Sequence, residues 1–381
     1  MLPTTVARVG DSPKLCVLGD FAWDVLIRTN SELLRGGDTF GEVVLLPGGS
    51  GANVAVWATR CGLTTTFIGK VGRDQMGLLA REDLDREGVA HHLIESGAHA
   101  TGSVAVFVDH TGERSMVSGH GADFYLLPSE LPSAPISGAD HLHLTAWSLF
   151  TDPPRAAARR AAALAKAAGA RISLDPGSFQ MIGEMGVDQF LSATTDLGVD
   201  VFLPNKEEAA VLTGVNDPEA ACRALAGLYP GALIVVKLDA DGALVGETGG
   251  VHHIPPHSNK LVDATGAGDS FAGAFLSRLL RGTDPVAAAD FAVRVAEWVI
   301  EHPGARPKPG PALARILAPP GSPRQTFSEA KKPTQRPKRS KGSTKPPIWH
   351  PFPLNPQPSL LFPQPFPLFP SPFSLVRRIR R

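Results

Sequence analysis

The chain has 381 residues, a length that suits one large domain or two modest ones. It carries 37 basic and 37 acidic side chains, but residues 1–318 hold 25 basic and 36 acidic ones, whereas residues 319–381 hold 12 and one. An acidic body argues against specific nucleic-acid binding, which needs a basic face. No stretch of about 20 apolar residues is present, so we expect no membrane-spanning helix.

Three cysteines, Cys16, Cys61 and Cys222, lie far apart in the sequence and lack the spacing of a metal site. We expect them to be small buried apolar side chains in a reducing compartment. The opening residues, MLPTTVARVGDSPK, contain no hydrophobic signal segment. Together these features predict a cytoplasmic location.

Short apolar runs alternate with helix-like segments through the body of the chain. Runs such as Leu233–Val236 are apolar throughout, which is typical of strands covered on both faces. Strands separated by helices of about 10–15 residues predict βαβ units around a mostly parallel sheet. We place strands at 15–19, 65–71, 141–144, 171–175, 200–203 and 233–238, and helices at 53–61, 74–87, 154–168, 206–213, 218–228 and 268–281.

Two regions, about 38–48 and 100–125, interrupt this alternation. Glu42–Leu46, Gly102–Val108 and Glu113–Val117 look like antiparallel ribbon, and Asp109–Gly112 (DHTG) is typical of a turn. We therefore predict a small β-sheet appended to the main domain.

Composition changes sharply after Ala318. Residues 319–381 contain 16 prolines in 63 residues, a basic run from Lys331 to Lys345 and repeated Phe-Pro pairs. Proline at this density blocks helices and central strands, so the tail is predicted to be disordered. An alternative is a tail that binds anionic surfaces. The predicted layout is an N-terminal extension (1–13), one α/β domain (14–318) and this tail.

Val262–Phe275 (VDATGAGDSFAGAF) joins a glycine-rich turn to an acid and a helix-like run. A helix starting near Gly268 would point its unpaired amides and its positive dipole end into the turn, where they would bind phosphate. Asp269 beside that pocket suggests phosphoryl transfer, with the carboxylate accepting a proton from a hydroxyl. The alternative is that Asp269 only caps the helix and the glycines only turn the chain.

Five segments resemble the landmarks of the ribokinase-like (PfkB) carbohydrate kinase family, in the same order. Residues 19–24 (GDFAWD), 48–53 (GGSGAN), 205–208 (NKEE) and 263–269 (DATGAGD) resemble its motifs, and residues 291–305 look like the helix and loop that close its nucleotide site. The resemblance spans about residues 14–317. It implies a three-layer α/β/α domain with a mostly parallel central sheet and a β-sheet lid over the sugar.

The resemblance also implies roles for individual residues. Asp269 matches the general base, and the anion hole matches Gly266, Ala267 and Gly268. The sugar-binding positions match Asp24, Gly48, Gly49 and Asn53. Asn205 and Glu208 match the motif for Mg²⁺ and phosphate, Glu208 acting through water, although their spacing also suits a helix cap.

Three further implied sites concern the nucleotide and a cation. Lys237 and Gly242 occupy the nucleotide-side strand and turn, where Lys237 either reaches a phosphate or points to solvent; Asp239 replaces the usual first glycine of that turn. Gly304 matches the loop beside adenine. Asp263 and Thr265 match a monovalent-cation site, which suggests activation by K⁺.

The implied function is ATP- and Mg²⁺-dependent phosphorylation of a hydroxyl on a small sugar. Ala22 and Ser50 depart from the residues that ribokinases favour, which argues mildly against ribose. Fructose, 2-keto-3-deoxygluconate, ribose and nucleosides stay open. The alternatives are a nucleoside kinase of the same family and a catalytically silent member that acts as a binding or scaffold protein. Relatives also suggest a homodimer formed through the lid.

Overall fold

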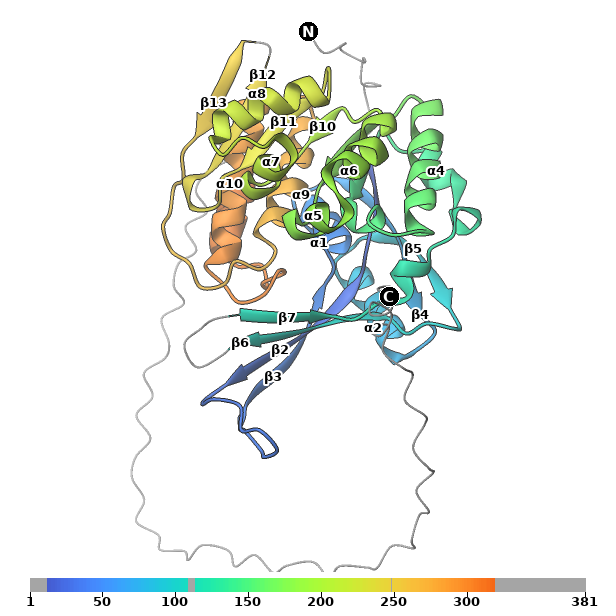
Figure 1. Cartoon of the computed structure of the whole chain (residues 1–381), viewed down its shortest axis with the longest axis vertical. Helices are drawn as coiled ribbons and strands as arrows, with labels where there is room; N and C mark the ends of the chain where they lie inside the picture. The colour runs from blue at the N-terminus through green and yellow to red at the C-terminus, as the bar shows by residue number, and fades with distance from the viewer. Residues whose placement is uncertain (1–11, 109–113, 248, 319–381) are drawn as a thin grey trace, which may run out of the picture. The chain divides into compact units, whose positions relative to one another are not determined.

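The structure is a computed structural model that describes residues 12–108, 114–247 and 249–318. The predicted tail, the predicted turn at 109–112 and most of the N-terminal extension lie outside these residues. Nine described strands form the main sheet, in the order β13-β12-β11-β10-β9-β8-β1-β4-β5 (Figure 1). Among these strands the pairings β11–β12 and β12–β13 are antiparallel, and the other pairings are parallel. The strand bounds are β1 (Lys14–Leu18), β4 (Thr64–Gly72), β5 (Ala90–Ser96), β8 (His141–Thr145), β9 (Arg171–Asp175), β10 (Val201–Phe202), β11 (Leu233–Lys237), β12 (Ala243–Glu247) and β13 (Gly250–Ile254).

Helices cover both faces of this sheet. Successive side chains of each strand point to opposite faces, so each face packs against its own layer of helices and forms a separate core. In β1, Leu15 and Val17 pack on one side, and Cys16 and Leu18 on the other. The first core takes α1 (Ser50–Arg60), α2 (Gln75–Arg86), α9 (Ala267–Leu279), α10 (Pro285–Ile300) and α11 (Pro311–Leu317). The second takes α3 (Ser133–Ser137), α4 (Pro154–Ala167), α5 (Phe179–Met185), α6 (Val187–Thr194), α7 (Lys206–Thr213) and α8 (Pro218–Leu228). The three-layer prediction is confirmed.

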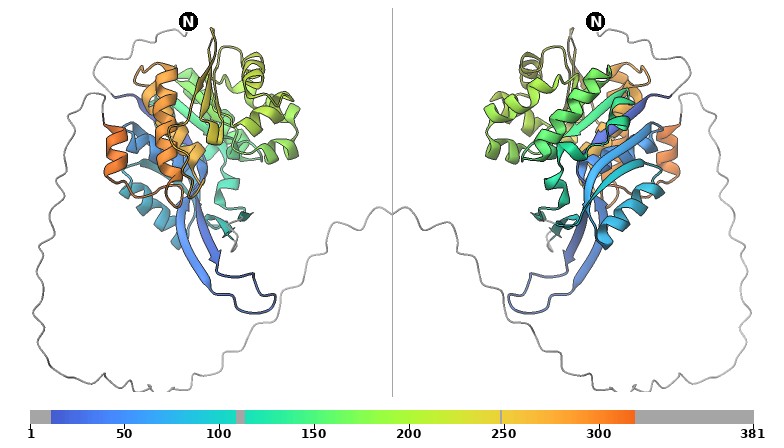
Figure 2. Two further views of the ribbon diagram at one scale, coloured as in Figure 1. Left: turned by 90° about the vertical axis from the view of Figure 1, so that its left-hand side faces the viewer. Right: turned by 90° about the vertical axis from the view of Figure 1, so that its right-hand side faces the viewer.

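A second sheet of four strands projects from the main body, in the order β3-β2-β6-β7 (Figures 1 and 2). It consists of β2 (Ala22–Thr29), β3 (Gly41–Gly48), β6 (Gly102–Val108) and β7 (Arg114–Ser118), and we call it the lid. The predicted ribbon was incomplete. Sequence analysis missed β2, and β2 pairs parallel with β6 rather than antiparallel.

Asp24, a predicted sugar-binding residue, lies in the lid and not in the main sheet, because it is the third residue of β2. The chain leaves the main sheet after β1, turns at Gly19–Phe21 and enters the lid at once. The apolar run of β2 does not alternate cleanly, because most of its side chains are partly buried on both faces of the lid.

The carboxyl ends of the parallel strands define where a ligand can bind. Strand β1 lies between β4 and β8, so connections diverge to either side of it, and open α/β sheets bind ligands at such a switch point. Asp20 follows β1, whereas Thr145, Asp175 and Lys237 are the last residues of β8, β9 and β11. Within the described ranges, no helix is both long and apolar enough to cross a membrane.

Cysteine placement agrees with the sequence prediction. Cys16 and Cys222 are buried, Cys61 is partly buried, and all three are free thiols. Burial raises the pKa of Cys16 and of Cys61 to about 12, so these thiols stay protonated.

Candidate active site

The N-terminus of α9 forms the centre of the candidate site. Its N-cap, Gly266, has φ 76°, and a Cβ there would lie 2.5 Å from the Cβ of Ala305. Both facts require glycine. Because α9 begins at Ala267, the amides of its first turn, those of Ala267, Gly268 and Asp269, lie where a helix lacks internal acceptors. This 13-residue helix can therefore direct amides and its positive dipole end at an anion.

Asp269 lies in this first turn and is held by an amide from α1. The Nδ2 of Asn53 donates to Oδ2 of Asp269 at 2.8 Å. Burial, reinforced by the negative charges of Asp175 and Asp20, raises the pKa of Asp269 to about 7, against the hydrogen bond from Asn53 and the charge of Lys237. A carboxylate with a pKa near neutral suits a general base.

Close packing of α1 against α9 brings Asn53 and Asp269 together. A Cβ on Gly273 would lie 2.7 Å from the backbone N of Ala58 and O of Val54. A Cβ on Gly51 would similarly lie 2.7 Å from the Cα of Gly19. Sequence analysis placed Gly19 and Gly273 within recognised segments, 19–24 and 262–275, but assigned neither of them a role in packing.

At the predicted sugar-binding positions, two glycines make room for backbone and for a carboxylate. A Cβ on Gly48 would lie 2.6 Å from Oδ2 of Asp24, and Gly49 has φ 85° with the backbone of Phe21 2.7 Å from its Cβ position. Burial, together with the charges of Asp20 and Asp263, raises the pKa of Asp24 to about 6, although Arg306 opposes this rise. Asp24 thus lies against the predicted sugar loop.

Helix α1 starts earlier than predicted. We expected it to begin at Asn53, but it begins at Ser50, so Asn53 lies in the first turn. The cause is Asp20, whose carboxylate accepts the amides of Ser50 and Gly51 at 2.9 and 3.1 Å and so caps the helix from a distant segment.

Lys237 points into the protein and not to solvent. Its Nζ pairs with Oδ2 of Asp175 at 2.6 Å, and both side chains are largely buried. The same Nζ is 3.4 Å from the Cβ position of Gly268. The end of β11 therefore places a buried ammonium beside the first turn of α9.

Asn205 and Glu208 form a reciprocal helix cap. Oδ1 of Asn205 accepts the amide of Glu208 at 2.7 Å, and Oε2 of Glu208 accepts the amide of Asn205 at 2.8 Å. Burial raises the pKa of Glu208 to about 7. The capping alternative is thus observed, and a role toward Mg²⁺ stays a prediction. In the part of the chain that the structure describes, no group of three or more His, Cys, Asp or Glu side chains is arranged to hold a metal.

Asp263 joins the glycine-rich turn to the loop after α10. Its Oδ1 accepts the amide of Thr265 at 2.8 Å and its Oδ2 that of Gly304 at 3.0 Å. Gly304 has φ 79°, and its Cβ position is 3.2 Å from Cδ1 of Leu46 in the lid. This loop therefore contacts both halves of the candidate site.

Two residues of the turn after β11, Asp239 and Gly242, have positive φ angles. Gly242 has φ 86°, and its Cβ position lies 2.1 Å from the carbonyl oxygen of Ile254. Asp239, which replaces the usual glycine, has φ 54° and pairs with Lys206 at 3.1 Å. Gly242 shapes the turn, and a contact between Gly242 and a nucleotide stays a prediction.

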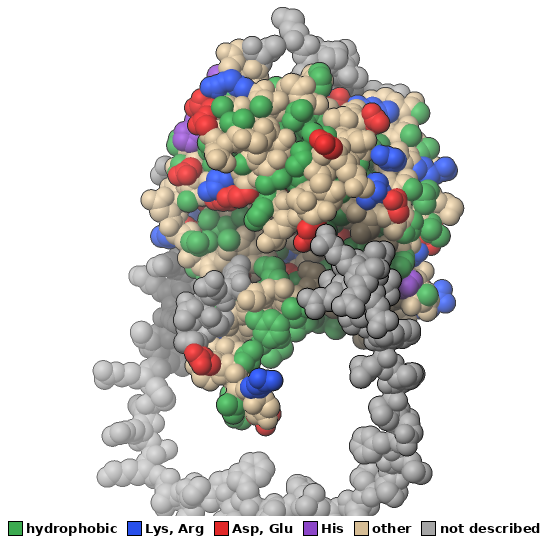
Figure 3. Space-filling model, viewed as in Figure 1, with side chains coloured by type: hydrophobic (Ala, Val, Ile, Leu, Met, Phe, Trp, Pro, Cys, Tyr) green, Lys and Arg blue, Asp and Glu red, His purple; other side chains and the backbone are tan. Residues whose placement is uncertain are grey.

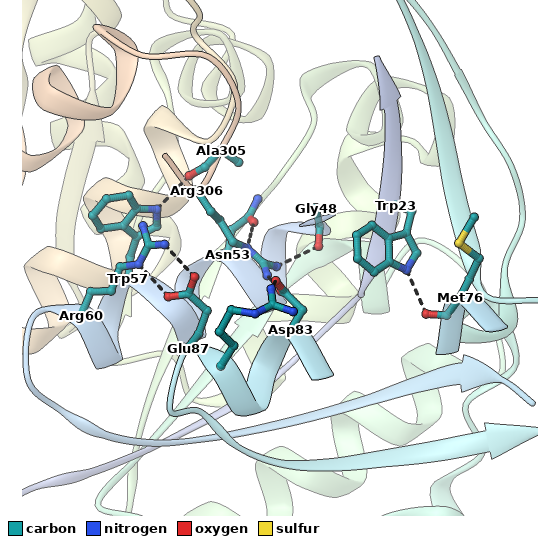
Figure 4. Close-up of polar contacts among 11 residues, drawn as sticks. Trp23, Gly48, Asn53, Trp57, Arg60, Met76, Asp83, Glu87, Ala305 and Arg306 are labelled. Carbon is teal, nitrogen blue, oxygen red and sulfur yellow. Dashed lines mark hydrogen bonds and ion pairs between the residues drawn. The ribbon is translucent and has the colours of Figure 1, made fainter. Parts of the chain in front are cut away.

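Sequence analysis missed one residue that touches several predicted positions. Arg306 donates from Nε to Oδ1 of Asn53 at 2.6 Å and from Nη2 to the carbonyl of Gly48 at 3.0 Å, and it pairs through Nη1 with Asp83 at 2.6 Å (Figure 4). Arg306 belongs to none of the recognised motifs. Its partners lie more than 220 positions away, so no local pattern indicates it.

Comparisons with known proteins agree with this geometry. Residues 12–311 match the profile described as "pfkB family carbohydrate kinase". The chain is 34% identical to a fructokinase of Escherichia coli over 273 residues, covering 70% of this chain and 85% of the relative. It is 31% identical to an ATP-dependent ribose-1-phosphate kinase of Halopiger xanaduensis, covering 79% and 96%. A putative ribokinase II from Escherichia coli superposes with a TM-score of 0.69 at 25% identity, covering 77% and 94%.

Proposed function

The chain belongs to the pfkB family of carbohydrate kinases, and we propose that it transfers the γ-phosphate of ATP to a hydroxyl of a small uncharged sugar, with Asp269 as general base. As a member of this family it is a phosphotransferase that acts on a hydroxyl group. One observation carries the proposal: a carboxyl with a pKa of about 7 lies in the first turn of α9, beside amides suited to an anion. Because the residues proposed as base and anion hole are all present, we disfavour the alternative of a catalytically silent binding or scaffold protein.

In the proposed mechanism, Asp269 removes the proton of the sugar hydroxyl as that oxygen attacks the γ-phosphorus. The bond between the γ-phosphorus and the bridging oxygen breaks, and ADP leaves. The amides of Gly266, Ala267 and Gly268 stabilise the charge on the transferring phosphoryl group. Lys237 lies close enough to Gly268 to assist them, and its partner Asp175 holds it there.

The residues also fit the family's use of ATP with Mg²⁺. Mg²⁺ keeps several waters and is usually held by one or two carboxylates together with nucleotide phosphates, so a cage of three ligands is not needed. Glu208, with Asn205, would hold Mg²⁺ through water near the end of β10. When bound, the ion neutralises charge on the phosphates. Gly242 and Gly304 would line the nucleotide.

The sugar side favours an uncharged substrate. Asp20 raises the pKa of both Asp24 and Asp123, so the three carboxyls lie within electrostatic reach of one another. Asp20 and Asp123 line a small cavity with Lys70, whose Nζ is tied to Glu130 at 2.6 Å. When ionised, these carboxyls would repel sugar acids and sugar phosphates, and the guanidinium of Arg306 would offset part of that repulsion. Fructose, ribose and nucleosides therefore stay as candidates, and 2-keto-3-deoxygluconate becomes unfavourable.

A panel of neutral sugars, nucleosides, sugar acids and sugar phosphates in an ADP-release assay tests this function. We expect turnover with at least one neutral sugar and none with the anionic compounds. Turnover with nucleosides alone would favour the nucleoside kinase, and efficient turnover of a sugar acid would contradict the charge argument.

We also propose that the turn at Asp263 and Thr265 holds a monovalent cation, completed by the loop at 303–310. Asp263 joins this turn to Gly304, so a cation there would stabilise the loop that flanks the nucleotide. We expect activity to fall several-fold when K⁺ is replaced by tetramethylammonium. Unchanged activity would contradict the site.

The lid carries a surface suited to a second copy of the chain. Pairing places Val25 between Leu45 and Ala105, and Ile27 between Val43 and Phe107. These side chains share the face opposite to Asp24, because successive residues of a strand point to opposite faces. Val43 is 68% exposed on this face, and hydrophobic side chains are visible on the lid in Figure 3.

We propose that two lids pack through this face in a homodimer, because exposed apolar patches of this kind mark protein interfaces. Sedimentation at micromolar concentration should show a dimer, and Val43→Glu should shift it toward monomer. A monomeric wild type would contradict the proposal.

A further inference from the structure

We propose that Arg306 is a positioning residue, which fixes the orientation of the Asn53 amide and through it both the sugar contact and the proton affinity of Asp269. This inference rests on the proposed function for its catalytic meaning. Its geometric part, the coupling of Arg306 to Asp269 through Asn53, stands on the contacts alone.

The Asn53 side chain is nearly fully buried between a cation and an acid. Its Oδ1 accepts from Nε of Arg306 at 2.6 Å, and its Nδ2 donates to Oδ2 of Asp269 at 2.8 Å. Arg306 has only donors, so it must face the amide oxygen. The amide nitrogen is thereby turned to Asp269, and one of its two hydrogens serves that bond. The second is available in this orientation for a sugar hydroxyl.

Without Arg306, only the carboxylate of Asp269 would favour this orientation of the Asn53 amide. A flipped amide would point its oxygen at the carboxylate of Asp269, where two acceptors repel. The two orientations have nearly the same shape, so packing alone discriminates weakly between them. The charged donor of Arg306 therefore adds to the effect of Asp269 and holds the amide oxygen of Asn53 away from the base.

Arg306 is itself held firmly. Its side chain is 2% exposed, and Asp83 in α2, whose side chain is 6% exposed, pairs with it at 2.6 Å. A buried charge without such a partner would be costly. Its third contact, to the carbonyl of Gly48, reaches the sugar loop (Figure 4). One guanidinium thus joins α1, α2 and β3 to the loop after α10.

A neighbouring pair supplies a matched control. Arg60 bonds the carbonyl of Pro307, next to Arg306, at 2.9 Å and pairs with Glu87 at 2.7 Å. Its side chain is also largely buried, and it stacks on Trp57. Arg60 therefore anchors the same loop to the same pair of helices, but its contacts do not include Asn53.

The proton affinity of Asp269 gives a readout that loop anchoring alone would not change. The groups that act on Asp269 are Asn53, Asp175, Asp20, Lys237 and Arg306. A hydrogen bond to a carboxylate favours its charged form, so losing the bond from Asn53 raises the pKa of Asp269 above its value of about 7. A base works when deprotonated, so the acidic limb of kcat/KM would move to higher pH.

The experiment compares wild type, Arg306→Lys and Arg60→Lys at a temperature at which all three proteins are fully folded. If Arg306→Lys folds poorly, Asp83→Asn serves as a milder variant. In protein labelled with ¹⁵N-asparagine, the Asn53 side-chain signals, assigned by their loss in Asn53→Ser, should titrate with a midpoint near 7 in wild type and Arg60→Lys. In Arg306→Lys the midpoint should rise by about half a pH unit or more. Asp83→Asn should shift it in the same direction by less.

Kinetics with the sugar found in the panel complete the test. Arg306→Lys should raise the sugar KM and lower kcat about tenfold each and shift the acidic limb upward, with the ATP KM within about twofold of wild type. An Arg306→Lys protein with the midpoint, limb and sugar KM of Arg60→Lys would overturn the inference. An inactive wild type, with a midpoint that still rises in Arg306→Lys and not in Arg60→Lys, would defeat the proposed function and leave the coupling confirmed.

Discussion

On the proposed nucleotide side of the candidate site lie the N-terminus of α9 and the buried Lys237, which is paired with Asp175, whereas the proposed sugar side carries the carboxyls of Asp20, Asp24 and Asp123. Asp269 stands between the two. Such a separation directs a polyanion to one side and an uncharged alcohol to the other. The pKa of Asp269 is raised because burial and the negative charges of Asp175 and Asp20 oppose its ionisation more than Asn53 and Lys237 favour it.

Removing the carboxylate of Asp269, which lies between the two sides, should have the largest effect on turnover. We expect Asp269→Asn to lower kcat by on the order of 10²-fold or more, because the general base is lost while shape is kept. Nucleotide affinity, measured by calorimetry, should stay within about twofold, since the amides of α9 are unchanged. Near-normal turnover would show that another group accepts the proton.

Neutralising the nucleotide side should come next. We expect Lys237→Met to lower kcat/KM for ATP about 10- to 100-fold, the loss of one charged hydrogen bond of about 1.5–3 kcal/mol. Sugar affinity should be retained.

Because Lys237→Met leaves Asp175 buried without its partner, it should also lower stability. The double variant Lys237→Met with Asp175→Asn should recover stability without recovering ATP binding. Recovery of both would mean that Lys237 is structural.

Neutralising the sugar side should have the smallest effect, and one that depends on pH. Burial and the charge of Asp20 raise the pKa of Asp123 to about 7, so ionising Asp123 in the folded protein costs stability. That cost is small around pH 4, where the carboxyl is protonated in the folded state and only about half ionised in the unfolded state, and it grows until pH passes about 7.

Asp123→Asn should therefore raise the melting temperature by a few degrees at pH 8, less at pH 5 and least at pH 4. Thermal unfolding followed by circular dichroism at the three pH values measures this. An equal rise in melting temperature at all three pH values would mean that the effect of Asp123→Asn comes from packing and not from charge.

Sequence alone determined much about this protein, and it did so where the physical cause is local. Strand–helix alternation predicted the three layers, since a strand buried on both faces must be apolar throughout. Gly49, Gly242 and Gly266 stand at left-handed backbone positions, a requirement of single residues that sequence displays directly. The α9 turn with Asp269 was predicted for the same reason: a helix terminus and its amides follow from consecutive residues.

Tertiary structure decided the contacts between distant segments. Asn53 and Asp269 are 216 positions apart, Lys237 and Asp175 62, and Arg306 and Asp83 223. Whether such side chains meet depends on strand order and on how closely glycines let helices approach, as Gly273 does between α1 and α9. The same holds for β2, whose place in the lid is set by its partners β3 and β6 more than by its own residues.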